Sequence, residues 1–155
     1  MKNQNKTKIL EVCMYSAGGC GVFSRVKQEA QMLSKKGYEV RIFSSDFTKG
    51  SKEKAPEHEK MGDILIRRFP AKKIGGESFT YFDYQKAALE FKPDVIFVHS
   101  YRHIHTIKAL KIAKRLNAKV YLVTHAPFAR EGFRKGVQNK IVWAYDKFFS
   151  PFYIK

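Results

Sequence analysis

The sequence Ile9-Leu10-Glu11-Val12-Cys13-Met14, followed by Tyr15-Ser16-Ala17-Gly18-Gly19-Cys20-Gly21, decides the fold class. The first six residues are mostly apolar, which predicts a strand covered on both faces, as in the centre of a parallel sheet. Beyond the glycine-rich loop, apolar residues recur at helical spacing from about residue 22 to 36, and Gly37 is a natural end for this helix. A strand, a short loop and a helix in this order begin a βαβ unit.

The same alternation continues along the rest of the chain. The patterns predict further strands and helices, namely strands over 38–43, 64–69, 94–98 and 119–124 and helices over 83–91, 104–117 and 139–149. Asp83 is the expected N-cap of the helix over 83–91. Polar segments predict loops over 46–62, 71–78 and 126–138. We therefore expect an α/β fold: a single Rossmann-like domain over residues 1–155, with three α/β/α layers and a mostly parallel sheet.

The composition is that of one globular domain. The chain has 155 residues, of which 44% are hydrophobic and 28% charged, which excludes a low-complexity or wholly disordered chain. No apolar run approaches the roughly 20 residues that span a bilayer, and Met1 to Lys8 carries no apolar leader segment. Cys13 and Cys20 form no disulfide framework. We therefore expect a cytoplasmic protein with reduced thiols.

Positive charge dominates the chain. Lys and Arg number 30 against 14 Asp and Glu, a formal net charge of +16, and the span Ser100 to Lys155 has 12 basic residues against two acidic ones. Such a field attracts phosphate in nucleic acid, anionic lipid or nucleotides. No nucleic-acid motif accompanies it, so nucleic acid is the less favoured partner. The expected membrane or anion surface consists of Lys108, Lys111, Lys114, Arg115, Arg130, Arg134 and Lys135.

The glycine loop is the first candidate site, because ligands of parallel α/β sheets bind beyond the carboxyl ends of the strands. Its three glycines let the backbone approach a ligand, and amides at the start of the helix favour phosphate. The alternative is a tight turn that needs glycine only for packing. Gly19-x-Gly21-x-x-Ser24 imitates a dinucleotide fingerprint, but its third glycine is missing. This argues against a nicotinamide-dependent enzyme.

Histidines follow two of the predicted strands. His99, His103 and His105 cluster after the strand over 94–98, and His125 follows the strand over 119–124. The cluster suits polar contacts to a substrate, a metal site or an uncommitted exposed set. No acidic residue or cysteine accompanies it in the sequence, so we expect no metal. His125 can transfer a proton or bond a substrate at neutral pH, or it caps the strand structurally.

Four motifs occur together in a fixed order. They are Gly18-Gly19, Leu33-x-x-x-Gly37-Tyr38-Glu39-Val40, Pro93-Asp94-Val95-Ile96-Phe97-Val98-His99-Ser100 and Thr124-His125. Each motif alone is common in α/β proteins. The ordered set resembles the N-terminal Rossmann-like domain of glycosyltransferase family 4, whose enzymes have the GT-B fold, over nearly the whole chain.

The resemblance implies a role for each motif. In this family two Rossmann-like domains face a cleft, the N-terminal one holding the acceptor and the C-terminal one the nucleotide-sugar donor. By resemblance, Gly18 and Gly19 approach the donor diphosphate, and His125 is the catalytic residue beside the reacting sugar. The acceptor contacts expected on the same side are His99, Tyr101, Arg102 and His103. Transfer retains the anomeric configuration, and no cofactor is expected because the nucleotide sugar is a substrate.

The resemblance also implies partners. The acceptor is expected to be a glycan or a lipid-linked molecule, reached at the inner face of a membrane through the basic residues. The C-terminal donor-binding domain is expected outside these 155 residues, in a longer protein or a separate subunit. The chain alone is therefore expected to be inactive. The alternative function is a non-catalytic basic module that binds anionic membrane or nucleic acid.

Overall fold

The computed structural model describes residues 6–75, 77–125 and 147. The chain divides into two compact units, 1–125 and 126–155, and the first is described here. Its elements are β1 (Lys8–Tyr15), α1 (Gly21–Lys35), β2 (Glu39–Ser45), β3 (His58–Met61), β4 (Ile64–Phe69), β5 (Ala71–Lys73), a 3-10 turn (Glu77–Phe79), β6 (Thr80–Phe82), α2 (Gln85–Phe91), β7 (Val95–His99), α3 (Ile104–Leu116) and β8 (Lys119–Val123).

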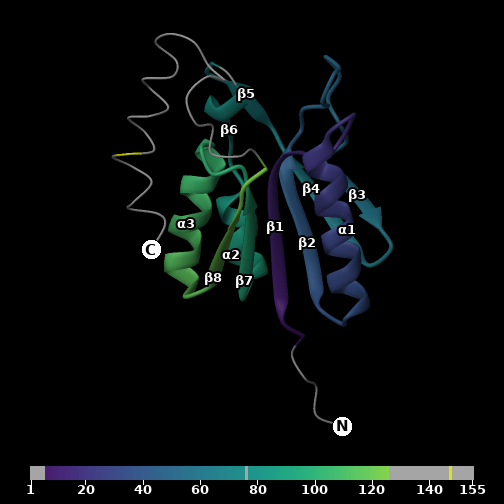
Figure 1. Ribbon diagram of the computed structural model, residues 1–155, viewed down its shortest axis with the longest axis vertical. Coiled ribbons are helices and arrows are strands. Elements are labelled where there is room, and N and C mark those ends of the chain that lie inside the picture. Colours follow the sequence, from purple (N-terminus) through teal and green to yellow (C-terminus); the bar gives the residue numbers. More distant parts are fainter. Residues whose placement is uncertain (1–5, 76, 126–146, 148–155) are drawn as a thin grey trace. The chain divides into compact units, whose positions relative to one another are not determined.

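A six-stranded sheet forms the centre of this unit. The strand order is β3-β4-β2-β1-β7-β8, and every neighbouring pair is parallel except β3 with β4. Figure 1 shows α1 on one side of the sheet and α2 with α3 on the other. The predicted Rossmann-like α/β architecture with a mostly parallel sheet is confirmed.

Both faces of the central strand β1 are covered. Leu10 and Val12 join the apolar cluster beneath α2 and α3, whereas Ile9 and Cys13 join the cluster beneath α1. Side chains alternate between the two faces of a strand, so Glu11 points to the α1 side together with Ile9 and Cys13. Glu11 is fully buried there, although a buried carboxylate is costly without partners. The partners of Glu11 lie at the candidate site described below.

Three short strands lie where the sequence predicts none. The segments 46–62 and 71–78, predicted as loops, contain β3 and β5, and β6 pairs with β5 in a separate antiparallel hairpin. β3 is exposed or half-buried along its length because it is an edge strand, and it shows no apolar alternation. The N-cap of α2 is Tyr84 rather than Asp83. The Asp83 carboxylate instead accepts the Gln85 N–H at 3.1 Å. The predicted loop over 126–138 lies outside the described residues, as does the predicted helix over 139–149 apart from Lys147.

A buried arginine fastens the loop after β1. The Arg68 side chain, at the end of β4, donates to Ser16 Oγ at 2.7 Å, to the Ser16 carbonyl at 2.8 Å and to the Pro56 carbonyl at 2.9 Å. It also pairs with Glu59 and is 1% exposed. These bonds hold the segment that leads from β1 into the glycine loop, so Arg68 supports the position of the candidate site.

Candidate active site

A pocket of about 450 Å³ opens at the carboxyl ends of the central strands. Its wall combines the end of β1, the start of α1, Lys49 of the loop after β2 and Glu77 of the 3-10 turn. The segments after β7 and β8 contribute His103 and His125. The three loops that the sequence analysis singled out therefore meet in one place. Parallel α/β sheets bind their ligands at this edge.

Gly18 and Gly19 have different surroundings. Gly18 has a φ of +79°, and a Cβ there would lie 2.2 Å from the Lys49 carbonyl oxygen. The Lys49 N–H also donates to the Ala17 carbonyl at 3.0 Å, so the loop after β2 packs directly on the glycine loop. Gly19 lines the pocket, and a Cβ on it would meet nothing within 4 Å. Packing therefore requires glycine at position 18, whereas position 19 leaves room for a ligand.

We expect Gly18→Ala to lower the free energy of unfolding by about 2–4 kcal/mol, because alanine adds both backbone strain and a clash with Lys49. Gly19→Ala is the matched control, and we expect it to change that free energy by less than about 0.5 kcal/mol. Urea unfolding of the two variants measures the difference. Equal stabilities of the two variants would contradict the packing described here.

The start of α1 forms part of the pocket wall. Gly21 and Val22 line the pocket, and the N-cap residue Cys20 makes no side-chain capping bond to the helix. The first backbone N–H groups of a helix lack partners within it, and they carry the positive end of the helix dipole. This part of the wall therefore suits a phosphate group.

An ion pair on the pocket wall is a feature that the sequence analysis missed. Lys49 pairs with Glu77, and the Lys49 Nζ lies 4.9 Å from the centroid of the Tyr15 ring. The hydrogen bond between the two side chains raises the pKa of Lys49 and lowers the pKa of Glu77, so both are charged at neutral pH. Lys49 lies in a loop and Glu77 begins the 3-10 turn, and neither segment carries a recognisable motif, so only their place in the fold identifies them.

A chain of hydrogen bonds runs from the core to the pocket. The Glu11 Oε2 lies 2.7 Å from the His99 Nε2, and the His99 Nδ1 lies 2.8 Å from the His125 Nε2. Glu11 and His99 are fully buried, whereas His125 is half-buried and lines the pocket. Burial, followed by the charges of His99 and Arg25, lowers the pKa of His125. His125 is therefore a neutral imidazole at pH 7, able to accept or donate a hydrogen bond.

The four expected acceptor contacts are placed differently. His103 lines the pocket, and burial lowers its pKa. His99 is buried, with both ring nitrogens bonded within the protein. Tyr101 and Arg102 are half-buried, and the Arg102 guanidinium lies 4.7 Å from the centroid of the Tyr101 ring. Among the described residues, His103 is thus the one of the four that the structure brings to the pocket wall.

His105, the remaining histidine of the cluster after β7, is buried inside the domain. His105 Nε2–H donates to the His99 carbonyl at 2.8 Å, and burial lowers the pKa of His105 to about 3. His105 is therefore a neutral structural residue.

Glu11, Glu29 and His99 each place one potential ligand atom within 4.8 Å of the others, so these three could hold a metal ion. Glu29 lies on α1 and Glu11 on β1, a pairing that no local sequence pattern reveals.

The basic surface is described only in part. Lys111, Lys114 and Arg115 are exposed on α3. Lys108 is 13% exposed at its side chain and bonds Asp83 at 2.7 Å, so it is held within the domain. The remaining expected members, Arg130, Arg134 and Lys135, lie outside the described residues. Within the described residues, we find no helix with the length and apolarity to cross a membrane.

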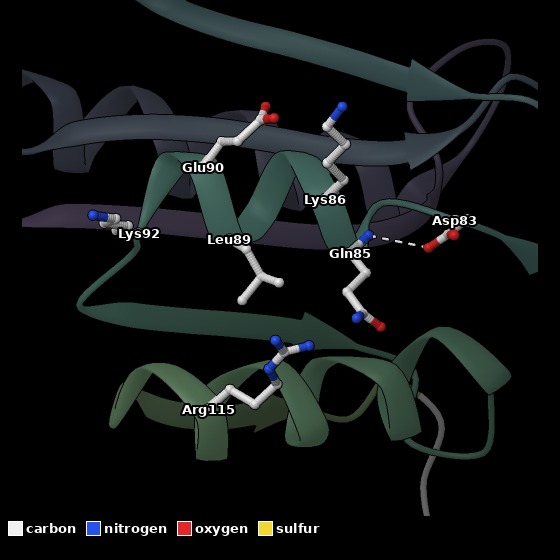
Figure 2. A pocket seen from close by; sticks show the side chains of 7 residues that line it. All are labelled: Asp83, Gln85, Lys86, Leu89, Glu90, Lys92 and Arg115. Carbon is white, nitrogen blue, oxygen red and sulfur yellow. Dashed lines mark hydrogen bonds between the residues drawn. The ribbon is translucent and has the colours of Figure 1, made fainter.

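A second hollow, of about 620 Å³, lies between α2 and α3. Figure 2 shows Leu89 of α2 directed toward Arg115 of α3, whereas the Glu90 side chain is directed away from Arg115. Acidic and basic side chains both line this hollow, which gives it no clear preference for an anion or a cation. It contains no histidine, and at the start of α2 the Gln85 N–H is already bonded to the Asp83 carboxylate, so the first pocket is the better candidate site.

A family model and two solved structures match this chain. The family model described as Glycosyltransferase Family 4 matches residues 19–153. The structure of sucrose-phosphate synthase from Thermosynechococcus elongatus matches with a TM-score of 0.58 and 12% identity, over 89% of this chain and 39% of that chain. An E. coli trehalose-6-phosphate structure with bound UDP-2-fluoro glucose matches with a TM-score of 0.47 and 14% identity, over 79% of this chain and 34% of that one. The chain thus spans well under half the length of either. A comparison with curated proteins gave no match.

Proposed function

The chain belongs to glycosyltransferase family 4, and on this premise we propose that it is the acceptor-binding N-terminal domain of a retaining glycosyltransferase. The enzyme transfers a sugar from a nucleotide-sugar donor to a glycan or lipid-linked acceptor. One observation carries this proposal: a single pocket combines an uncapped helix start with the neutral imidazole of His125. The first group suits a diphosphate, and the second suits the sugar attached to it.

The donor diphosphate binds at the start of α1. Gly19 and Gly21 line the pocket without side chains, so a phosphate can approach the backbone amides closely. We assign the close approach to the donor diphosphate to Gly19, because Gly18 packs against the backbone of Lys49. The Lys49 ammonium lies on the same wall, where its charge is offset by its partner Glu77. The nucleotide itself binds to a donor-binding domain in the rest of the protein or in a partner subunit.

His125 acts on the transferred sugar. A neutral imidazole beside the reacting carbon can bond a sugar hydroxyl and stabilise charge that develops as the leaving group departs. His103 lies on the same wall and contacts the acceptor. The reaction needs neither a cofactor nor a metal ion, since the leaving diphosphate is stabilised by amides and basic side chains. Lys111, Lys114 and Arg115 provide a cationic face with which a cytoplasmic enzyme can meet an anionic membrane.

Sugar transfer by the protein at its natural length tests this function. Radiolabelled UDP-, GDP- and ADP-sugars are incubated with the enzyme and with a membrane extract of its own cells. We expect label from one donor to enter a glycan or lipid product, and NMR of the product to show the anomeric configuration of the donor. The same assay at high salt measures the contribution of the basic face to acceptor delivery. A folded protein that transfers no sugar from any donor, yet binds anionic vesicles, would instead be a non-catalytic basic module.

A further inference from the structure

Glu11 is a buried acid for which the proposed function gives no role. It lies on the α1-facing side of β1, between the apolar residues Ile9 and Cys13 of the core. Its Oε2 bonds the His99 Nε2, whereas its Oε1 has no hydrogen-bond partner among the described residues. Burial raises the pKa of Glu11, and the bond to His99 opposes that rise. A carboxyl group in the core costs stability. A functional role would explain why Glu11 lies at this position.

The register of the sheet directs Glu11 toward the pocket. β1 and β7 are parallel neighbours, and Glu11 pairs with Phe97. His99 follows Phe97 by two residues, so it shares the same face and lies one step nearer the carboxyl edge. His125 follows β8, the next strand of the sheet. The three residues therefore form a line from the core to the pocket, with two short contacts of 2.7 and 2.8 Å.

These contacts make the hydrogen positions of the three residues depend on one another. Each contact holds one hydrogen, and a neutral imidazole has one N–H and one bare nitrogen. If Glu11 is ionised, His99 must donate from Nε2, and its bare Nδ1 then accepts the Nε2–H of His125. His125 consequently presents Nδ1 as an acceptor. One extra proton, on Glu11 or on His99, reverses the second bond and turns the His125 Nδ1 into a donor.

We infer that Glu11 and His99 are positioning residues that fix the tautomer and the ring orientation of His125. The inference rests on the proposed role of His125 in sugar transfer. His99 was expected to contact the acceptor, but in this arrangement it supports His125 instead. This role is consistent with the complete burial of His99. A buried carboxylate that holds an imidazole in one tautomer serves the same purpose in other catalytic sites. In this fold the orientation is transmitted through a second imidazole, whose ring lies 5.0 Å from that of His125 between centroids.

A metal ion would exclude this arrangement. Glu11, Glu29 and His99 could ligate a divalent cation, but a metal-bound Nε2 of His99 carries no proton. His99 would then hold its proton on Nδ1 and donate to His125. This tautomer is the opposite of the one expected in the hydrogen-bond relay Glu11–His99–His125 when Glu11 is ionised. The tautomer of His99 thus decides between the two arrangements.

Nitrogen NMR of the histidine rings tests the inference directly. The protein at its natural length is labelled with 15N-histidine, treated with a chelator and measured at pH 7, with signals assigned by His→Asn variants. For an ionised Glu11, we expect His99 and His125 each to show a single Nε2–H tautomer. An Nδ1–H tautomer at His99 would overturn this assignment. Stoichiometric binding of Zn²⁺, lost in both Glu11→Gln and Glu29→Gln, would establish a metal site in its place.

Variants of Glu11 separate positioning from folding. Glu11→Met has a similar shape but no acceptor, and we expect both histidines to become tautomer mixtures. Glu11→Gln keeps an oxygen that can accept the His99 N–H, so it should retain more of the single tautomer. Glu29→Gln is the matched control, since it removes a nearby carboxylate that is outside the relay, and it should leave both tautomers unchanged. Unchanged His125 signals in a folded Glu11→Met protein would refute the relay. If this variant fails to fold, the tautomers of the wild-type protein still show whether the relay exists.

Kinetics give an independent readout. We expect Glu11→Met to lower kcat by about 10- to 100-fold with little change in the KM for the donor, as for other residues that orient a catalytic group. Glu11→Gln should recover part of that loss. If the wild-type protein transfers no sugar, the proposed function fails while the NMR result on the relay still stands. If transfer proceeds and the tautomers differ from those expected, only the relay fails.

Discussion

Replacing His125 with alanine is expected to lower the kcat for sugar transfer by about 100- to 1,000-fold. The imidazole is the neutral group on the pocket wall that the Glu11–His99 pair orients. Its removal would take away the proposed contact to the reacting sugar, whereas the backbone proposed to bind the diphosphate would remain. We therefore expect the KM for the donor to change only a few-fold. Initial rates of the natural-length protein at saturating donor measure this effect.

Stability measurements distinguish this result from a folding defect. His125 is half-buried at the end of its strand, so His125→Ala should change the free energy of unfolding by less than about 1 kcal/mol. His58→Ala is the matched control, because His58 lies exposed on the edge strand β3. It should leave both turnover and stability unchanged. A His125→Ala enzyme with nearly wild-type kcat would remove His125 from the active site.

Replacing Arg68 with alanine is expected to have the largest effect on stability, a loss of about 3–5 kcal/mol in the free energy of unfolding. The guanidinium donates three hydrogen bonds to Ser16 and Pro56 and pairs with Glu59. Alanine would leave buried polar groups without partners and would open a cavity beside the loop after β1. Urea unfolding monitored by far-UV circular dichroism measures the change, provided that the m value stays constant.

The neighbouring residue Arg67 provides the matched control. Arg67 lies on the same strand, and its half-buried side chain pairs with the exposed Glu57 at 3.2 Å. Ion pairs that solvent reaches contribute little, so Arg67→Ala should cost less than about 1 kcal/mol. If Arg68→Ala cost no more than Arg67→Ala, the buried bonds of Arg68 would not anchor the glycine loop as described.

The parallel core was predictable because its strands carry their own signal. Ile9–Met14 and Asp94–Val98 are almost continuously apolar, as strands covered on both faces must be. The short strands β3, β5 and β6 lack such a signal. β3 reads His-Glu-Lys-Met and is defined by its pairing with β4 at an edge of the sheet, not by any apolar face of its own. A sequence pattern reports burial, so it misses strands that are formed mainly by backbone pairing.

The candidate site was predictable to a similar extent. The glycine loop and His125 follow predicted strands, and the carboxyl edge of a parallel sheet collects such segments. Glu11 was not predicted as a site residue, because no local pattern shows which distant residue a lone acid in an apolar run contacts. Its partner His99 is 88 residues away, and only the register of β1 with β7 brings them together. A charged residue within a strand that is expected to be buried on both faces is a signal for a buried partner.

Donor binding followed by NMR of the histidine rings tests the central claim most directly. That claim is that the pocket lined by His103 and His125 is the active site. A nucleotide-sugar donor is titrated into the natural-length protein labelled with 15N-histidine, and the ring signals are followed to saturation. We expect the signals of His103 and His125 to shift with one dissociation constant, while His58, which is exposed on β3, stays unchanged. Saturable donor binding that leaves both pocket histidines unmoved would contradict the account and place the site elsewhere.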